Sequence, residues 1–248
     1  MDQLLEATFQ AEITHFWFRG LRRFAQPLIA DALAGREAPR VLDAGCGTGC
    51  NLRMLKGLEN AFGVDLNRVG LGHAHESGLS RLARATVVAM PFADRVFDLV
   101  TSFDVLYALQ PADARRAVCE MARVLKPGGT LIVNVAALEV LRGGHSVLAE
   151  EVRRYDRGLL REELEAAGLR PVRMTYTNVG VFPLVLAVRL AQRAAGMDTP
   201  EQTGREISVP PAPVNAALDA LLALEARIAR TVNFPFGSSL LCAARKPA

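Results

Sequence analysis

Short apolar runs alternate with helical periods along the middle of this chain and predict strands that alternate with helices. The expected strands cover residues 40–45, 60–65, 84–89, 98–104, 129–137, 170–178 and 238–244. The clearest helices cover about 50–58, 111–125 and 159–168. Because short connections join these elements, we expect a parallel sheet with helices on both faces.

Two regions interrupt this alternation. Residues 1–39 precede the first strand and are predicted to form a helical lid that ends at Pro39. Residues 179–234 show helical periods punctuated by prolines, and they separate the last two expected strands. A structureless loop of that length is uncommon in a compact domain, so we expect a helical cap. The core domain would then comprise residues 40–178 and 235–248.

The composition narrows the classes of function. Half of the 248 residues are hydrophobic, which fits one globular α/β domain with an elaboration. A net charge of +3 is too small to require a nucleic-acid partner, and none is expected. The four cysteines lack the spacing of a zinc site or a disulfide framework, so we expect a reduced, cytoplasmic protein without a metal. We expect no signal peptide and no transmembrane segment, because the most apolar run (179–187) is too short to span a bilayer.

The most informative motif is Val-Leu-Asp-Ala-Gly-Cys-Gly-Thr-Gly at residues 41–49. A buried strand that enters alternating glycines before a helical pattern predicts a strand–turn–helix unit. Glycine permits positive φ and lets a ligand lie against bare backbone. The spacing lacks the third glycine of the dinucleotide motif, because Cys50 stands there. Asp43 would repel a pyrophosphate, so the turn predicts a cationic ligand.

A second acid supports this interpretation. Asp65 ends the next short apolar strand, about twenty residues after Asp43. An acid at the end of the second strand of an open parallel sheet is placed to accept both hydroxyls of a ribose. The two acids therefore suit a ligand with a sugar and a positive charge but no phosphates. In this order and at this spacing, the motifs resemble those of class I S-adenosylmethionine-dependent methyltransferases.

The resemblance implies a Rossmann-like α/β fold with a seven-stranded, mostly parallel sheet, and S-adenosylmethionine as cofactor. In that fold the sixth and seventh strands pair antiparallel and a short turn usually joins them, so the cap is a departure. The implied reaction moves a methyl group to an oxygen or nitrogen of a small-molecule acceptor, such as a natural product, a sugar or a lipid-linked molecule. The implied cofactor contacts are Asp43, Gly45, Cys46, Gly47, Gly49, Asp65, Leu66, Thr86, Val87, Met90, Phe103 and Asp104.

Thr86 departs from the family pattern, because an acid commonly stands there and holds the adenine amino group. Its hydroxyl can accept the same hydrogen bond more weakly. The Val87 N–H is expected to reach the ring and Met90 to pack on its face; the alternative is an ordinary exit from a strand. Residues 102–107 lack the Asn/Asp-Pro-Pro-aromatic run of members that methylate adenine or glutamine amides, which argues against those substrates.

The candidate substrate contacts come from three segments at the same sheet edge. Phe103 and Asp104 are expected to enclose the methionine end of the cofactor, which leaves Tyr107 on the substrate side. Residues 15–23 are rich in aromatics and arginines. They form either an amphipathic helix packed on the domain or a lid whose aromatics contact the sulfonium and whose arginines bind a carboxylate. The lid interpretation adds three substrate contacts, His15, Trp17 and Arg19.

The segment after the fifth strand supplies His145, Arg154 and Tyr155. A neutral imidazole is available near pH 7, so His145 is the candidate general base, with a purely structural histidine as the alternative. His73 and His75 stand two residues apart, cannot share a helix face and are expected at the surface.

In the cap, Glu225 interrupts an apolar stripe and is expected either to pair with an arginine or to lie at a rim. The apolar cap helix, flanked by Arg189 and Arg193, suits either contact with a lipid surface or a plain hydrophobic contact in a monomer or homodimer. Two other functions stay open: a non-catalytic cofactor-binding scaffold or sensor, and a nicotinamide-dependent oxidoreductase, which the glycine spacing disfavours.

Overall fold

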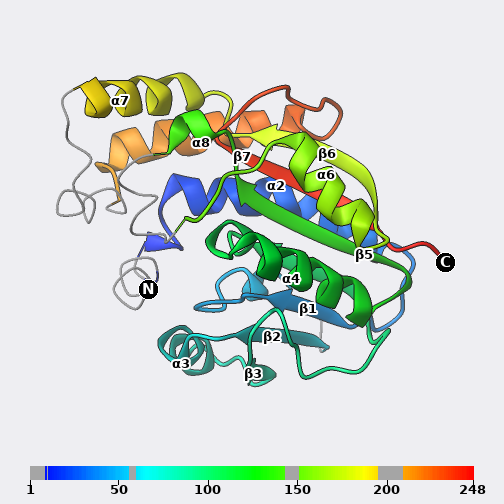
Figure 1. Ribbon diagram of the computed structural model, residues 1–248. Coiled ribbons are helices and arrows are strands. Elements are labelled where there is room, and N and C mark those ends of the chain that lie inside the picture. The colour runs from blue at the N-terminus through cyan, green and yellow to red at the C-terminus, as the bar shows by residue number, and fades with distance from the viewer. Residues whose placement is uncertain (1–8, 10, 56–59, 143–150, 195–208) are drawn as a thin grey trace.

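The computed structural model describes residues 9, 11–55, 60–142, 151–194 and 209–248 (Figure 1). Within them, seven strands form one sheet in the order β3-β2-β1-β4-β5-β7-β6. Their bounds are β1 (Val41–Ala44), β2 (Ala61–Asp65), β3 (Leu82–Arg84), β4 (Phe97–Phe103), β5 (Leu125–Ala136), β6 (Arg170–Thr177) and β7 (Ser239–Arg245). Only β7 runs antiparallel to its described neighbours, which confirms the mostly parallel, Rossmann-like α/β fold.

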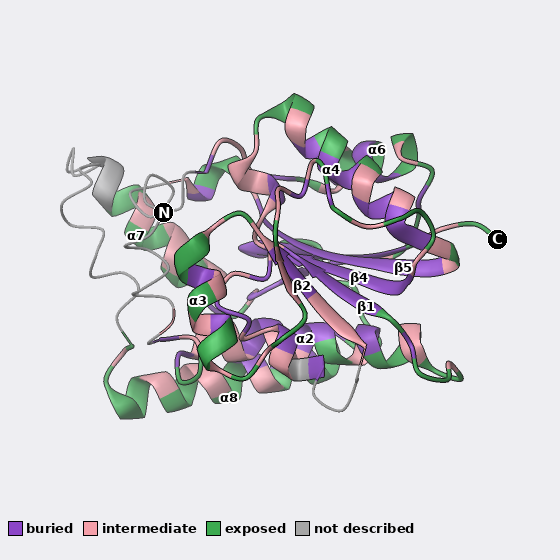
Figure 2. Ribbon diagram, turned by 90° about the horizontal axis from the view of Figure 1, so that it is seen from below, coloured by how far each residue is buried: buried purple, intermediate pink, exposed green. Residues whose placement is uncertain are grey.

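Helices cover both faces of the sheet. The α-helices are α2 (Phe16–Leu33), α3 (Arg68–Glu76), α4 (Pro111–Val124), α6 (Arg157–Ala166), α7 (Phe182–Ala194) and α8 (Ala212–Ile228). Short 3₁₀ turns are η1 (Leu52–Leu55), η2 (Leu106–Ala108) and η3 (Glu139–Leu141). Figure 2 shows three layers, with α4 and α6 above the buried strands and α2 and α8 below them. None of these described helices has the length and hydrophobicity that a membrane span requires.

The sheet divides the hydrophobic core in two because side chains alternate along each strand. On β5, Leu131 and Val133 point toward α4 and α6, whereas Ile132 points toward α2 and α8. All three are fully buried, and each contributes about 1.5–3 kcal/mol by leaving water. This alternation also decides where polar residues of the strands point, because Asp43 shares the face of Val41 on β1.

Helices α2 and α8 form one layer although they are far apart in the sequence (Figure 2). A β-carbon on Gly20 would lie 2.5 Å from Cδ1 of Leu222, so glycine is what lets the two helices approach. Arg23 donates to both carboxylate oxygens of Asp219 at 2.5 and 2.9 Å, and Arg19 approaches the same carboxylate at 3.1 Å. The predicted lid helix is thus part of the layer under the sheet, whereas a lid role for the segment before it stays a proposal.

Two predicted elements are wrong in position. The third strand is β3 at Leu82–Arg84 rather than 84–89, because Thr86 starts a turn: its carbonyl accepts from the N–H of Ala89 at 3.2 Å. The predicted helix at 50–58 is the 3₁₀ turn η1, and its last residues lie outside the described ones.

Glu225 is also placed differently from the prediction. Its carboxylate is buried and accepts hydrogen bonds from the N–H groups of Val179 (2.8 Å) and Gly180 (3.1 Å), which precede α7. It therefore stabilises the chain turn between β6 and α7, and it forms no ion pair with an arginine among the described residues.

Candidate functional site

The glycine turn joins β1 to η1 at the carboxyl edge of the sheet. Gly45, Gly47 and Gly49 have φ of 86°, 50° and 76°, in the region that favours glycine. A β-carbon on Gly45 would lie 2.2 Å from Cγ2 of Val105, so the turn packs directly on the segment after β4. The strand order reverses between β1 and β4, which is where open α/β sheets bind ligands.

Asp65 is tied to this turn from the neighbouring strand β2. One carboxylate oxygen accepts from the N–H of Gly47 at 2.8 Å and the other from the N–H of Asn67 at 2.7 Å. The structure thus brings together the two motifs on which the resemblance rests. Each oxygen keeps a lone pair for a further donor, so the carboxylate is compatible with the predicted contact to a ribose.

Asp43 is a buried carboxyl with one unused oxygen. Only 2% of the residue is exposed, and Oδ1 accepts from the hydroxyl of Thr101 at 2.8 Å. Its Oδ2 has no partner among the described residues. Burial raises the pKa of Asp43 to about 7, and the charges of Asp65 and Glu12 add to the effect while the bond from Thr101 opposes it. A positively charged donor would satisfy this oxygen, as the amino-acid end of S-adenosylmethionine can.

Glu12 belongs to the same group, although no sequence motif indicated it. The hydroxyl of Thr48, in the glycine turn, donates to Glu12 Oε2. Burial raises the pKa of Glu12. Phe9 stacks on His73 of α3 with ring centroids 4.2 Å apart, so the described part of residues 9–15 lies along the turn and α3. The expectation of a surface position is therefore wrong for His73, which is half-buried, and right for His75, which is exposed.

The other predicted contacts around the turn differ in exposure. Leu66 follows β2 and is 63% exposed, which leaves it available to a ligand. Cys46 is buried beneath β2, where a β-carbon on Gly63 would lie 2.8 Å from its Sγ. Burial, together with the carboxyls of Asp43 and Asp65, raises the pKa of the Cys46 thiol and keeps it protonated.

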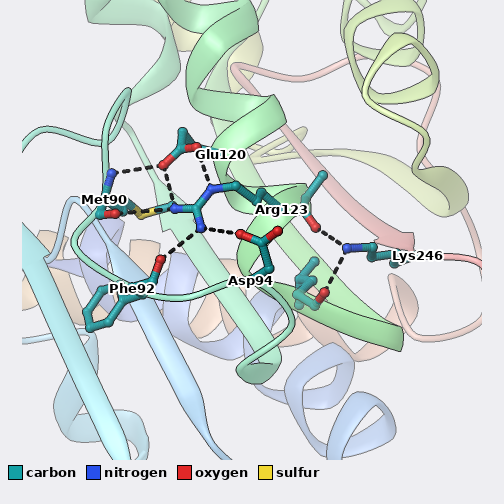
Figure 3. A network of polar contacts seen from close by, with 8 residues as sticks. Met90, Phe92, Asp94, Glu120, Arg123 and Lys246 are labelled. Carbon is teal, nitrogen blue, oxygen red and sulfur yellow. Dashed lines mark hydrogen bonds and ion pairs between the residues drawn. The ribbon is translucent and has the colours of Figure 1, made fainter.

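On the predicted adenine side, two side chains of α4 hold the loop after β3 (Figure 3). Arg123 donates to the carbonyls of Met90 (3.2 Å) and Phe92 (2.8 Å) and pairs with Asp94 at 2.7 Å. Glu120 pairs with Arg123 and accepts from the Met90 N–H at 2.9 Å. The loop is thus fixed at three backbone atoms, so its approach to a ligand is set by α4.

Two of the loop residues predicted to contact adenine are buried. Val87 and Met90 are 7% and 5% exposed and belong to the core cluster under α4. The Thr86 hydroxyl accepts from the N–H of Val88 at 3.3 Å. Their contacts with an adenine therefore stay predictions.

A second carboxyl of interest, the half-buried Asp104, directly follows Phe103 at the end of β4. It adopts φ +61°, uncommon for a non-glycine residue, and such strain is found most often at functional sites. The Asn134 side-chain amide donates to Asp104 Oδ1 at 2.8 Å, and the Asp104 N–H donates to the Asn134 carbonyl at 2.9 Å. Burial, aided by the charge of Glu151, raises the pKa of Asp104 to about 7.

Two of the predicted substrate-side residues lie around Asp104. Burial, with the carboxyls of Asp104 and Glu151, raises the pKa of Tyr107, and the charge of Arg154 acts in the opposite direction. Arg154 is buried and pairs with Glu151 at 2.9 Å. This acceptor-side cluster (Asp104, Tyr107, Asn134, Glu151 and Arg154) therefore joins the ends of β4 and β5, and sequence reasoning missed Asn134 and Glu151.

The remaining substrate-side candidates are placed elsewhere. Tyr155 is 1% exposed, and its hydroxyl donates to Glu163 of α6 at 3.1 Å, so it packs in the core. His15 is buried and caps α2: its Nδ1 accepts from the Trp17 N–H at 3.1 Å, and burial lowers its pKa. Arg19 pairs with Asp219, as described above. His145 lies outside the described residues.

Comparison with known proteins agrees with this geometry. Residues 42–133, which carry the glycine turn, Asp65 and Asp104, match the family model described as a methyltransferase domain. A malonyl-[acyl-carrier protein] O-methyltransferase from Enterobacter lignolyticus is 37% identical over 158 residues, which are 60% of this chain and 61% of that one. A putative 23S rRNA (guanine-N(1)-)-methyltransferase from Bacillus subtilis is 32% identical over 162 residues, 61% of this chain and 54% of that one.

Superposition on solved structures covers almost the whole chain. A SAM-dependent methyltransferase from Thermotoga maritima superposes with a TM-score of 0.60 at 17% identity, covering 99% of this chain and 100% of that one. At that identity the likeness concerns the fold. The chain spans about half the length of the curated relatives it matches. Residues 42–133 carry a methyltransferase domain, and the glycine turn, the strand order and these matches support its place in the class I S-adenosylmethionine-dependent methyltransferase family.

Proposed function

We propose that this protein transfers a methyl group from S-adenosylmethionine to an oxygen or nitrogen of a small-molecule acceptor. The observation that carries the proposal is Asp43, a buried carboxyl at the start of the glycine turn, which is also tied to Asp65. One oxygen of Asp43 has no partner within the described ranges of the chain. The bound cofactor would supply a methyl group already activated on a sulfonium. The turn at residues 45–49 and Asp65 would hold it, and the loop fixed by Arg123 would bear on its adenine.

Asp104 is the described side chain best placed to take a proton from the acceptor. It lies one residue from Val105, which packs against Gly45 of the cofactor turn. Its pKa is raised to about 7, so the carboxyl can accept and release a proton near neutral pH. Asn134 holds its Oδ1 by a 2.8 Å hydrogen bond and so fixes its orientation. Such alignment of reacting groups can contribute several kcal/mol to the rate.

Several observations support a small acceptor with an apolar part. The net charge of +3 offers no strong attraction for nucleic acid. Helices α7 and α8 and the segment after them expose large apolar side chains: Leu184, Leu190, Leu221, Leu224 and Phe236. A surface of this kind suits a hydrophobic or lipid-linked acceptor, or a homodimer contact. The alternative class of acceptor is a nucleic acid, because one relative is named as a putative rRNA methyltransferase.

The test uses the purified chain with methyl-labelled S-adenosylmethionine. Calorimetry should first detect binding of S-adenosylhomocysteine, the demethylated product. Pools of hydroxylated, amine-bearing and lipid-linked small molecules, and total RNA, are then screened for label transfer. Transfer to a small molecule supports the proposal, and transfer to RNA alone overturns the acceptor class. Binding without any turnover would favour a cofactor-binding scaffold, and binding of a nicotinamide dinucleotide instead would revive an oxidoreductase.

A further inference from the structure

We propose that Glu12, in the segment before α2, is a cofactor-recognition residue that binds the ammonium group at the amino-acid end of the cofactor together with Asp43. The inference rests on the proposed function. It adds a binding residue from outside residues 42–133, the part of the chain that matches the family model.

The first observation is the position of Glu12. Its carboxylate accepts a hydrogen bond from Thr48, which lies between the two positive-φ glycines Gly47 and Gly49. Its charge also acts on Asp43, whose pKa it helps to raise. A carboxylate from the N-terminal segment thus reaches the centre of the turn that is expected to hold the cofactor.

The second observation is that several contacts hold this segment in place. Arg22 Nη2 donates to the Glu12 carbonyl at 2.6 Å. Asn215 of α8 donates to the Thr14 carbonyl and accepts from the Phe16 N–H, each at 2.9 Å. Phe9 stacks on His73 on the other side of Glu12. A carboxylate fixed at both flanks can serve as a preorganised ligand contact.

The third observation is an imbalance of charge. Glu12, Asp43 and Asp65 interact as like charges around the turn. The cations near Glu12 are Arg22 and Arg53, and both lower its pKa. Neither forms an ion pair with the Glu12 carboxylate within the part of the chain that the structure describes: Arg22 bonds to a carbonyl and to Cys50, and Arg53 bonds to Ser77. A ligand cation would relieve this repulsion.

The ammonium is the cofactor's only cationic group that can donate hydrogen bonds. Asp43 Oδ2 has no hydrogen-bond donor in the part of the chain that the structure describes, and an unsatisfied buried acceptor costs about 1–3 kcal/mol. A sulfonium carries positive charge but no N–H, and it must stay open toward the methyl acceptor. An ammonium has three donors and can contact Asp43 and Glu12 at once.

The experiment compares two ligands by calorimetry on Glu12→Gln. S-adenosylhomocysteine carries the ammonium; 5′-methylthioadenosine keeps the adenosine and the thioether but lacks the amino-acid end. Because glutamine still accepts from Thr48 but has no charge, we expect affinity for S-adenosylhomocysteine to fall about tenfold or more. Affinity for 5′-methylthioadenosine should stay within about twofold. Glu37→Gln, at an exposed glutamate after α2, is the matched control and should change neither.

The outcomes separate this inference from the proposed function. Failure of the unmodified protein to bind S-adenosylhomocysteine would count against the function. Binding by the unmodified protein with equal affinity in Glu12→Gln would overturn the role of Glu12 alone. Equal losses for both ligands would also overturn it, because Glu12 would then only hold the turn. Thr48→Val, which keeps the carboxylate charge, should cost less affinity than Glu12→Gln and provides a second variant if the first does not fold.

Discussion

Asp43 and Asp104 are both carboxyls with a pKa raised to about 7, yet Asp43 is buried, Asp104 is half-buried and their surroundings differ. Asp43 lies on a regular strand and accepts from the Thr101 hydroxyl, and its other oxygen has no partner among the residues that the structure describes. Asp104 sits at positive φ after its strand and is held by the amide of Asn134. The same shift therefore fits two proposed roles: Asp43 would bind a cation, and Asp104 would exchange a proton with the acceptor.

The largest expected effect is on cofactor binding, from a substitution of Gly47, which should leave the surroundings of Asp104 unchanged. Gly47→Val places a β-branched residue at φ +50° and disturbs the hydrogen bond from the N–H of residue 47 to Asp65. Binding of S-adenosylhomocysteine should therefore fall below detection. Gly168→Val is the control, because Gly168 also has positive φ (76°) but precedes β6 at the opposite edge with open space around it. If Gly47→Val binds normally by calorimetry, the turn is not the cofactor site.

On the acceptor side, Asp104→Asn should lower turnover by about 10²–10⁴-fold while affinity for S-adenosylhomocysteine barely changes. The amide keeps the size of the side chain but cannot take a proton. The rate of the unmodified enzyme should rise with pH through about 7 as Asp104 ionises, and the variant should lose that step.

The same kinetic measurement on His145→Ala decides between the two candidate bases, because the sequence favours His145. A large loss of turnover there, with Asp104→Asn near normal, would assign the base to His145. A loss in neither variant would mean that alignment alone drives the reaction.

A smaller effect is expected at Asp65. Asp65→Ala removes a charge-assisted acceptor for ribose hydroxyls. Its affinity for S-adenosylhomocysteine should therefore be lower by about 10–100-fold, equivalent to about 1.5–3 kcal/mol. Asp31→Ala, on the exposed side of α2, is the control. Equal affinities in calorimetry would show that Asp65 does not contact the ribose.

The smallest effect concerns pH. A cation prefers ionised Asp43, so affinity for S-adenosylhomocysteine should rise about tenfold from pH 6 to pH 8, and Asp43→Asn should flatten the curve.

The free energy of unfolding should change with pH in the opposite direction to the ligand affinity. A carboxyl whose pKa is raised in the folded state stabilises it at low pH, and that contribution is lost as pH rises toward about 7. Chemical denaturation of the free protein between pH 5 and pH 8 should therefore show declining stability, whereas a rise would contradict the raised pKa of the two acids.

Those parts of the site that depend on the spacing of neighbouring residues could be predicted from the sequence. Alternating glycines after an apolar strand indicated the turn, and Asp65 followed from the end of the next strand. Glu12 could not be predicted, because it reaches the turn only through the packing of α2 on the sheet and carries no motif. In the sequence, Asn134 looks like an ordinary strand residue. It bonds to Asp104 because β5 pairs with the end of β4.

Errors arose where a local pattern was weaker than a competing contact. The apolar run at 84–89 resembles a strand, but the Thr86 hydroxyl and carbonyl close a turn there. Tyr155 follows the fifth strand as a substrate contact would, yet Glu163 and Arg153 bind its hydroxyl within the core. Such choices depend on residues that come later in the chain.

Strand β7 is the last element of the chain but lies inside the sheet, between β5 and β6. The described part of β6 pairs only with β7, and α8, just before β7, anchors the segment that carries Glu12. During synthesis on the ribosome, β1 to β5 can form a sheet early, but β6 stays unpaired until β7 emerges. Asn215 of α8 is also made late, so the segment that carries Glu12 gains this support only after β1 to β5 have been synthesised.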